Sequence, residues 1–464
     1  MTATDAALPW RPVIDRAAGP LYLAIADQLA ADVASGALPA GTRLPPQRTL
    51  ADALGVDLTT VSRAYAEAGR RGLIDARVGQ GTFVRRRAAP RAAPTSSGLV
   101  DLSMNLPPRF DDPALVARMW AGAAGLASGG LDLLLRYQEP GGAAPDRAAG
   151  AYWLQARLPE ITPDRVLVCP GAQGALTAVT GLLAAPGETI LVEALTYPGF
   201  RSLAAHLRIN LVPVTMDAEG LTPDAFDAAC RETHPKALYG TPTLHNPTTA
   251  TMSLARRQAI VAIAREHQVP IIEDDAYGAL VPGGPPPLGA LAPELTYHIA
   301  GLAKCLSPAL RIAYLAAPDA RMAARLAGAI RATAAMASPL TAAVATSWIE
   351  SGVADLVVAA ILAEAAARRA LAARILAQDT APVGPHGFHM WLKLPAPWTR
   401  GEFTARLRAA GIGAVPSDAF ALAAPPEAVR LGLGAAATRE ELAQGLRLVA
   451  DLLAEPPSMS SMVV

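Results

Sequence analysis

The first 85 residues show the apolar spacing of three short helices followed by a hairpin. From Leu21 to Gly36 the large apolar residues recur every three or four positions, which predicts a helix with one buried face that ends at Gly36. The stretch QRTLADALGV predicts a shorter helix closed by Gly55. The following stretch, DLTTVSRAYAEAGRRGL, predicts a third helix capped at Asp57 or Thr59.

Two short helices joined by a tight turn at a glycine match a helix-turn-helix. In the second of them, Val61, Tyr65 and Ala68 fall on one face, and we expect them to point into the core. The run LIDARVGQGTFV then places two β-rich segments around a GQG triplet, which predicts a hairpin, or wing. The pattern therefore predicts a winged helix-turn-helix domain, which we assign to residues 1–86.

From about residue 100 the pattern changes to alternating strands and helices. Apolar runs such as RVLVCPG, ETILVEAL, KALYGTPT and VPIIEDDAY alternate with helical stretches such as GALTAVTGLLAA and LARRQAIVAIAREHQ. Such alternation predicts an α/β body, over residues 100–455, with a large and mostly parallel sheet. Ligand sites in such bodies lie at the carboxyl ends of the strands. The apolar stretch after residue 352 is interrupted by charges, which predicts a helix of a soluble protein rather than a membrane span.

The net charge of zero conceals an uneven distribution along the chain. Residues 1–99 hold 12 arginines and 8 acidic residues, so a modestly basic first domain precedes a mildly acidic body. Residues 87–99 are Arg, Ala, Pro and Ser without periodicity, which is typical of a linker, and residues 456–464 are expected to be a flexible tail. Three widely spaced cysteines indicate neither a disulfide framework nor a zinc site. Because no secretory signal is evident at the start of the chain, we expect a cytoplasmic protein.

Several residues with chemical potential follow the predicted strands. The small residues of GAQ (171–173) could bind an anion at a helix start, or could simply pack tightly. Tyr197 could stack on a planar ring or belong to the core, and Asn246 stands before a proline that keeps its backbone extended. Acidic residues and Tyr277 end the run VPIIEDDAY, where burial demands either an arginine partner or a metal. No further ligands are evident nearby, so a metal is not expected.

The stretch GLAKCLSPALR contains Lys304, one of only three lysines in a chain with 37 arginines. We expect a strand that ends at this lysine. An amine held among apolar groups loses proton affinity and becomes a usable nucleophile, whereas the alternative is an ordinary surface lysine. An anion cup, an aromatic ring, an amide, a carboxylate and an amine are together the groups that pyridoxal phosphate requires. The sequence therefore predicts a pyridoxal phosphate site at the strand ends.

The N-terminal motifs RLPPQRTLADALGV, TTVSRAY and GQGTFV closely resemble the winged-helix domain of the GntR family of bacterial regulators. The resemblance implies that the helix from Thr59 enters the major groove of double-stranded DNA and that the wing lies near the minor groove. For each arginine the alternative is a solvated surface charge. The residues expected to contact DNA are Arg43, Arg48, Thr59, Thr60, Ser62, Arg63, Gln80 and Thr82.

The order of motifs in the body resembles the fold-type I aminotransferases. The resemblance implies that Lys304 forms a Schiff base with the cofactor. Asp274, rather than Asp275, would pair with the ring nitrogen, because the family places that acid three residues before the tyrosine. Arg430, in EAVRLGLGAAA, would bind the α-carboxylate of a substrate. The remaining cofactor residues implied are Gly171, Ala172, Gln173 and Arg311 for the phosphate, Tyr197 for the ring face, and Asn246 and Tyr277 for the ring hydroxyl.

A GntR-type domain fused to an aminotransferase-like body resembles the MocR subfamily of regulators. The resemblance implies a homodimer that binds an operator with paired half-sites and senses an amino acid, an amine or pyridoxal phosphate. The alternative is a genuine aminotransferase that acts on an amino acid, with the DNA-binding domain secondary. Two departures bear on this choice. Gly301 and Ala303 replace residues that often carry hydroxyls, and Thr249 stands where a glycine commonly follows NPT.

Overall fold

The structure is a computed structural model that describes residues 8–14, 19–35, 37–39, 41–77, 81–85, 100–126, 130–376 and 385–455. The chain divides into two compact units, residues 1–96 and 97–464, which are described separately. The predicted linker, 87–99, and the predicted tail, 456–464, lie outside the described residues.

The first unit is a winged helix-turn-helix, as its apolar pattern predicts. Gly55 ends the second helix with a left-handed φ of 63°, and the Asp57 carboxylate caps the third by accepting a hydrogen bond from the Thr59 amide at 2.8 Å. Val61, Tyr65 and Ala68 are buried, as predicted. The elements are α1 (Leu21–Ala34), α2 (Gln47–Leu54), α3 (Leu58–Arg70) and the antiparallel hairpin β1 (Ile74–Arg77) and β2 (Gly81–Val84).

The second unit is built on a seven-stranded sheet in the order β4-β12-β11-β10-β9-β5-β6. The predicted mostly parallel arrangement is confirmed, with one exception: β12 runs antiparallel to both of its neighbours. The strands are β4 (Val166–Cys169), β5 (Thr189–Glu193), β6 (Asn210–Val214), β9 (Ala237–Gly240), β10 (Ile271–Asp274), β11 (Thr296–Gly301) and β12 (Ala313–Ala316).

Helices cover both faces of this sheet, which explains why its strands are almost wholly apolar. Alternate residues of β4 divide between two cores: Leu167 packs with one set of helices and Val168 with another. On the first face lie α7 (Gly171–Leu183), α8 (Pro198–Leu207) and α12 (Ala320–Ala334). On the other lie α6 (Ala144–Leu154), α9 (Pro223–Thr233), α10 (Leu254–Glu266), α11 (Leu288–Leu291) and α13 (Pro339–Glu350).

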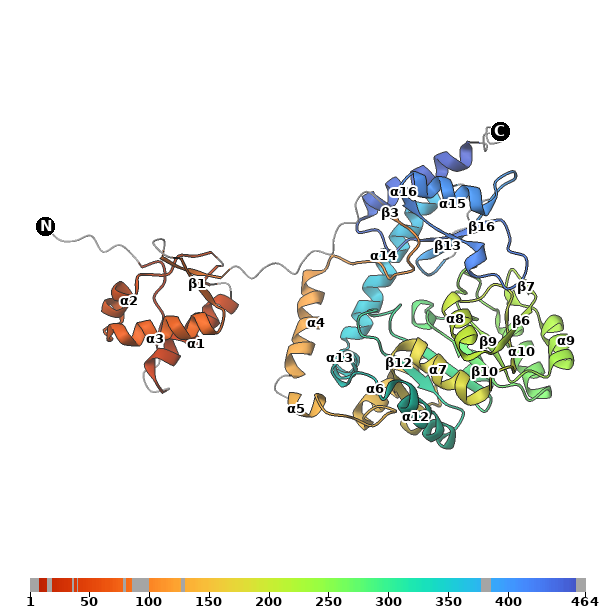
Figure 1. Cartoon of the computed structure of the whole chain (residues 1–464), viewed down its shortest axis with the longest axis horizontal. Coiled ribbons are helices and arrows are strands. Elements are labelled where there is room, and N and C mark those ends of the chain that lie inside the picture. Colours follow the sequence, from red (N-terminus) through yellow and green to blue (C-terminus); the bar gives the residue numbers. More distant parts are fainter. Residues whose placement is uncertain are drawn as a thin grey trace. The chain divides into compact units, whose positions relative to one another are not determined.

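A smaller sheet completes the second unit, at the top of that unit in Figure 1. It has the order β13-β16-β15, and the long helix α14 (Val353–Ile375) leads toward it. The first strand of the unit, β3 (Val100–Asp101), pairs in parallel with β14 (Ile412–Gly413), so the start of the body lies beside its end. The other elements here are β13 (His389–Lys393), β15 (Val415–Pro416), β16 (Ala428–Gly432), α15 (Arg400–Ala409) and α16 (Arg439–Ala454).

The remaining elements are short or peripheral. They are α4 (Pro113–Gly125), α5 (Leu131–Leu134), β7 (Met216–Asp217), β8 (Gly220–Leu221), and the 3-10 turns η2 (Pro163–Arg165), η3 (Gly278–Leu280) and η4 (Ser417–Ala419). Within the described ranges, no helix combines the length and the apolar character needed to cross a membrane.

Candidate functional site

The predicted body residues gather where β4, β9, β10 and β11 end. Gly171 opens α7 directly after β4, Asn246 follows β9, and Asp274 is the last residue of β10. One expectation about backbone structure is wrong. β11 ends at Gly301, and Lys304 lies in the turn that follows it rather than at the end of the strand. The turn carries the amine beyond the sheet edge, toward the residues that begin the body.

Lys304 is held in an environment that disfavours its charge. Its Nζ donates a hydrogen bond to the backbone oxygen of Asn105. Burial and, to a smaller extent, the charge of Arg430 together lower the pKa of Lys304 to about 8, and Asp274 only partly offsets them. About a tenth of this amine is therefore unprotonated at pH 7, far more than of an ordinary lysine, as a nucleophilic lysine requires.

Asp274 presents one free carboxylate oxygen. Its Oδ2 accepts a hydrogen bond from the Tyr239 hydroxyl at 3.1 Å, whereas its Oδ1 is buried and has no partner among the described residues. Burial raises the pKa of Asp274 to about 6. The neighbouring Asp275 instead forms an ion pair with Arg157 at 3.1 Å. Of the two acids, Asp274 thus has the oxygen available to pair with a protonated ring nitrogen.

Gly171 and Arg311 form a cradle that suits an anion. Gly171 has a left-handed φ of 75°, and a Cβ built there would lie 3.5 Å from the guanidinium carbon of Arg311. Arg311 is exposed and pairs with no carboxylate in the part of the chain that the structure describes. Ala172 and Gln173 follow in the first turn of α7, where backbone N–H groups are unpaired. The side chain of Gln173 is already used, because it donates to the Gly199 backbone oxygen at 3.1 Å.

Tyr197 lies at the start of α8 with its ring against Gly199, where any Cβ would overlap the ring. Burial raises the pKa of Tyr197, and the charge of Asp274 adds to this effect while Arg311 and Arg430 oppose it. The phenol ring is thus within electrostatic reach of the predicted acid and of both predicted arginines.

Arg430 is a buried cation without a carboxylate partner among the described residues. Its Nη1 donates to Asn246 Oδ1 at 3.0 Å and its Nη2 to the Ser103 backbone oxygen at 2.5 Å, while its Nε has no partner. Burial lowers the pKa of Arg430. An uncompensated buried charge is costly, so this guanidinium favours an anionic ligand. Asn246 and Arg430, both predicted from sequence, are therefore in direct contact.

Three residues of the site were not predicted from sequence. Asn105 Nδ2 donates to the Tyr277 hydroxyl at 2.7 Å, and the Asn105 backbone oxygen accepts from Lys304. Ser103 contacts Arg430, and Tyr239 contacts Asp274. Asn105 and Ser103 belong to the stretch LSMNLPP, residues 102–108, and nothing in its composition indicates contact with Lys304. Tyr239 lies within an apolar strand and carries no local signal.

The two departures from the aminotransferase pattern have structural counterparts. Thr249 has a φ of 65°, a conformation that glycine adopts freely and that β-branched residues rarely adopt. The unusual threonine is therefore strained, at a cost of order 1–3 kcal/mol. Gly301 lies against Ala172, where an added Cβ would come within 3.3 Å of the alanine methyl group. Neither Gly301 nor Ala303 supplies a hydroxyl beside Lys304.

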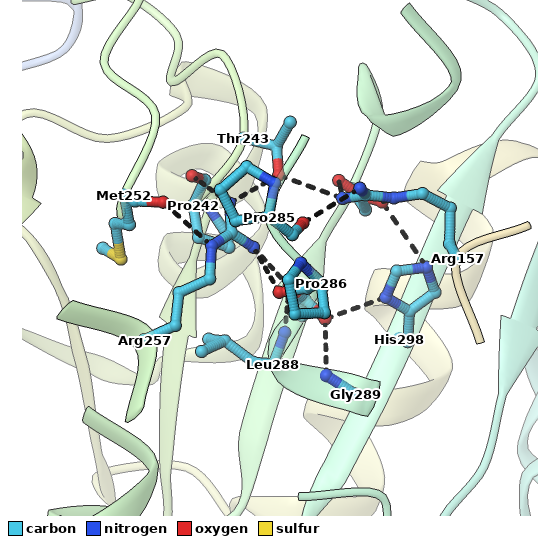
Figure 2. Close-up of polar contacts among 12 residues, drawn as sticks. Arg157, Pro242, Thr243, Met252, Arg257, Pro285, Pro286, Leu288, Gly289 and His298 are labelled. Carbon is cyan, nitrogen blue, oxygen red and sulfur yellow. Dashed lines mark hydrogen bonds and ion pairs between the residues drawn. The ribbon is translucent and has the colours of Figure 1, made fainter. Parts of the chain in front are cut away.

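A buried ion network lies beside Asp274 and is drawn in Figure 2. Arg157 pairs with Asp275, and Arg257 lies 3.8 Å from Glu273. The two arginines also donate to backbone oxygens, those of Pro285 and Pro242 among them. Two of the three acids of the run VPIIEDDAY, Glu273 and Asp275, thus have arginine partners, the first of the two alternatives open from the sequence, whereas Asp274 has none within the described ranges. The network fixes the end of β10, where Asp274 lies, and the turn after it, which carries Tyr277.

In the first unit, the residues predicted to contact DNA differ in how exposed their side chains are and in whether those side chains already form hydrogen bonds within the unit. Arg43 and Arg48 are exposed, and Arg48 lies within the first turn of α2. Arg63 is exposed and its guanidinium lies 4.1 Å from the centre of the Tyr22 ring. Thr60 and Thr82 are half-buried. Arg43 also pairs with Phe83 in an antiparallel bridge, which attaches it to the wing.

Two of the predicted contacts already have internal partners. The Ser62 hydroxyl donates to Gln47 Oε1 at 2.6 Å and so ties α3 to α2. The Thr59 hydroxyl donates to the capping carboxylate of Asp57 at 2.6 Å. A contact from Ser62 or Thr59 to DNA would have to share or exchange these hydrogen bonds. Gln80 lies outside the described residues.

Comparison with known proteins finds two families in one chain. The family described as aminotransferase class I and II matches residues 99–449, and the gntR family of bacterial regulatory proteins matches residues 21–84. The HTH-type transcriptional regulator YdeF of Bacillus subtilis is 31% identical over 96% of this chain and 97% of its own length. The HTH-type transcriptional regulator TauR of Rhodobacter capsulatus is 29% identical, over 84% of this chain and 87% of its own.

Solved structures show the same fold for the body. The α-aminoadipate aminotransferase LysN of Thermus thermophilus has a TM-score of 0.69 and 24% identity, covering 77% of this chain and 92% of that chain. A multiple substrate aminotransferase of Thermococcus profundus gives a TM-score of 0.69 at 23% identity, covering 78% of this chain and 92% of that chain.

Proposed function

Because the chain belongs to the aminotransferase class I and II family and carries a gntR-family domain ahead of it, we propose that it is a pyridoxal phosphate-dependent transcriptional regulator of the MocR kind. In this role it binds double-stranded operator DNA in the cytoplasm, as a homodimer. Two similar full-length proteins carry the name of transcriptional regulator, which supports the proposal. A metabolic enzyme has no evident use for the helix-turn-helix.

The observation that carries the cofactor assignment is the free Oδ1 of Asp274, close enough to the Lys304 amine for their charges to interact. Pyridoxal phosphate supplies an aldehyde that condenses with primary amines, and its protonated ring nitrogen needs an anionic partner. Lys304 would hold the cofactor covalently and Asp274 would hold the proton at the ring nitrogen. Gly171, Ala172, Gln173 and Arg311 would bind its phosphate, Tyr197 its ring face, and Asn246 and Tyr277 its hydroxyl.

The contacts of residues 103–105 provide a route by which a ligand could be sensed. A carboxylate-bearing effector that pairs with Arg430 competes with the Ser103 backbone oxygen for the same guanidinium. Covalent engagement of Lys304 likewise removes its hydrogen bond to the Asn105 backbone oxygen. Because this segment follows directly on residues 87–99, we infer that effector binding changes the start of the body and thereby the DNA-binding unit. Effector binding can shift the balance between the effector-free and the effector-bound conformation only if the effector binds these two conformations with different affinities.

The cofactor proposal is tested by saturating the purified chain with pyridoxal phosphate, reducing with borohydride and mapping the adduct. The three lysines provide an internal control, because Lys236 and Lys393 are the only competing side-chain amines. We expect visible absorbance and an adduct on Lys304, and we expect Lys304→Ala to remain folded without that absorbance. A colourless wild-type chain, or an adduct on either other lysine, would reject the cofactor assignment.

The regulatory proposal is tested by gel shift against DNA from upstream of the gene, with and without pyridoxal phosphate, and with random DNA as control. A preference for the upstream DNA at moderate salt is expected, and equal affinity for random DNA would reject it. The guanidinium of Arg430, which has no carboxylate partner among the described residues, also favours a second function, transamination of an amino acid. Sustained turnover with any amino donor would support that alternative, whereas spectral change without turnover would support sensing.

A further inference from the structure

Asn105 contacts two residues of the candidate cofactor site through two different groups. Its side-chain Nδ2 donates a hydrogen bond to the Tyr277 hydroxyl at 2.7 Å, and its backbone oxygen accepts one from Lys304 Nζ. The residue is 8% exposed, and its side-chain Oδ1 is buried without a partner in the described chain. A buried acceptor without a partner costs stability. The amide therefore donates to Tyr277 in spite of that cost, which is typical of a functional role.

The backbone that carries Asn105 is held closely against β16. The backbone N–H of Gly432 donates to the Leu102 oxygen at 2.6 Å. A Cβ added at Gly432 or at Gly434 would overlap backbone oxygens of residues 102–106, so this close approach requires glycine at both positions. The fold thus fixes where the amide of Asn105 lies.

Only the hydroxyl proton of Tyr277 remains to be oriented. The buried ring packs edge-on against Phe388, with ring centres 6.0 Å apart, and lies tilted against the His389 ring at 5.4 Å. The hydroxyl oxygen accepts from Asn105, and its own proton has no acceptor among the described residues. A hydroxyl that already accepts a hydrogen bond keeps its proton for another acceptor and becomes a stronger donor.

We propose that Asn105 is a positioning residue that makes Tyr277 a hydrogen-bond donor to the ring hydroxyl oxygen of pyridoxal phosphate. This inference rests on the proposed function, and it gives Asn105 no direct contact with the cofactor. A donor stabilises the ring oxygen in its unprotonated form, so it lowers the pH at which the bound cofactor loses one proton. The ring oxygen shares that proton with the nitrogen contributed by Lys304, and its loss changes the visible absorbance. Asn105 thereby sets the pH range over which the site holds this proton.

Other charged and titratable groups lie near the Tyr277 hydroxyl or the Asn105 amide and act on the same proton. Because substitution of Asn105 leaves all of them in place, their effect is the same in the wild type and in the variants below. The groups are Tyr197, Asp274, Lys304, His389 and Arg430.

The test is a pH titration of the visible absorbance of the full-length chain saturated with pyridoxal phosphate. Asn105→Leu removes the donor at nearly constant volume and should raise the midpoint by about 0.5–1 pH unit, because part of a hydrogen bond to a charged oxygen is lost. Met104→Leu is the matched control, since Met104 lies in the same segment with its side chain exposed, and it should keep the wild-type midpoint. An unchanged or lowered midpoint in Asn105→Leu overturns the proposal.

A double-mutant cycle with Tyr277→Phe separates this role from a merely structural one. In the Tyr277→Phe background, Asn105→Leu should move the midpoint by less than about 0.3 pH units, because Asn105 acts through the missing hydroxyl. An equal shift in both backgrounds overturns the proposal.

Asn105→Asp keeps the shape of the side chain and serves as a second variant if Asn105→Leu fails to fold. Its carboxylate takes the hydroxyl proton of Tyr277 instead of donating to the hydroxyl, so the midpoint should rise, and rise more with the Tyr277 hydroxyl than without it. A rise that is independent of the hydroxyl overturns the proposal. A wild-type chain that stays colourless would reject the proposed function itself, whereas a coloured wild type with unshifted variants rejects only the role of Asn105.

Discussion

Asp274 and Arg430 are buried and Lys304 is half-buried, and the pKa values of all three are displaced against their charged forms. None of the three forms an ion pair within the described ranges, although a folded chain gains stability when buried charges are paired. Such unfavourable burial is typical of sites that await a ligand with complementary charge. At the scale of single residues, the candidate site is therefore a place where stability is given up for chemistry.

The raised pKa of Asp274 predicts the effect of Asp274→Asn on the cofactor-free chain. The folded pKa, about 6, lies above the ordinary value of 3.8, so the folded state binds this proton more tightly than the unfolded state. Its stabilising effect is present below pH 4 and is lost as the pH rises through 6. Asp274→Asn should therefore raise the free energy of unfolding by about 1–3 kcal/mol at pH 7.5 and hardly at pH 4.

Urea unfolding at the two pH values measures this difference. Asp275→Asn is the matched control, because it breaks the ion pair with Arg157 and should destabilise the chain at pH 7.5. A loss of stability in Asp274→Asn at pH 7.5 would contradict the expected sign.

The lowered pKa of Lys304 predicts how covalent attachment of pyridoxal phosphate depends on pH. With a pKa of about 8, the unprotonated fraction of the amine rises roughly thirtyfold between pH 6.5 and 9 and then levels off. The rate at which visible absorbance develops should follow this fraction. Arg430→Met removes a like charge and should move the midpoint to higher pH. A rate that keeps rising well above pH 9 would show that the amine has an ordinary pKa.

At the scale of elements, the DNA-binding unit is arranged so that α3 is held from several sides. Asp57 caps its start, Ser62 bonds Gln47 of α2, and the Tyr65 hydroxyl donates to the Pro45 backbone oxygen at 2.8 Å. These contacts orient the helix without using Arg63, one of its exposed arginines. The helix is thus positioned by internal hydrogen bonds while exposed cations stay available for phosphates.

Arg48→Ala should weaken binding to all DNA sequences alike and reduce the salt dependence of binding. Each phosphate contact that is lost changes the slope of log K against log salt by about one. Arg70→Ala is the matched control, since Arg70 already pairs with Glu67 at 2.7 Å on the same unit. Gel shifts at several salt concentrations measure both slopes. Equal slopes for Arg48→Ala and the wild type would show that Arg48 makes no contact with DNA phosphates.

At the scale of the whole molecule, exposed apolar side chains support the proposed homodimer. Trp120 in α4 is 71% exposed, and Leu133, Leu135 and Tyr137, in and after α5, are 60%, 68% and 88% exposed. Val116 and Trp120, both in α4, also line one mostly apolar cavity together with Phe110 and Trp348. Large exposed apolar side chains in consecutive elements are typical of an interface between subunits.

Trp120→Glu should therefore shift the chain from dimer to monomer at low micromolar concentration, because a charge in an apolar interface must be desolvated. Sedimentation velocity measures the change. Leu448→Glu, on α16, is the control substitution at an exposed apolar position outside this region and should leave the dimer intact. A wild-type chain that is already monomeric would reject the homodimer proposal.

Much of the architecture follows from local signals in the sequence. The helix-turn-helix is predictable because Gly55 is a stop signal for α2 and Asp57 a start signal for α3, and both act within one turn of the chain. The strands of the body are predictable because they are buried on both faces and therefore uniformly apolar. The antiparallel direction of β12 has no such local signal, since the backbone direction of a strand depends on its neighbours in the sheet.

By itself, the sequence determined that this chain joins a winged helix to an aminotransferase fold, and it marked Lys304, Asp274 and Arg430 as candidates, because residue type and motif order are properties of the chain. Only the tertiary structure decided which atoms of these residues are free. The bond from Asn105 to Tyr277 spans 172 positions, and no local pattern encodes so distant a pairing. The same holds for the unpaired oxygen of Asp274 and the unpaired nitrogen of His298. Burial and hydrogen bonding depend on which distant segments pack together, and that is settled only when the whole chain folds.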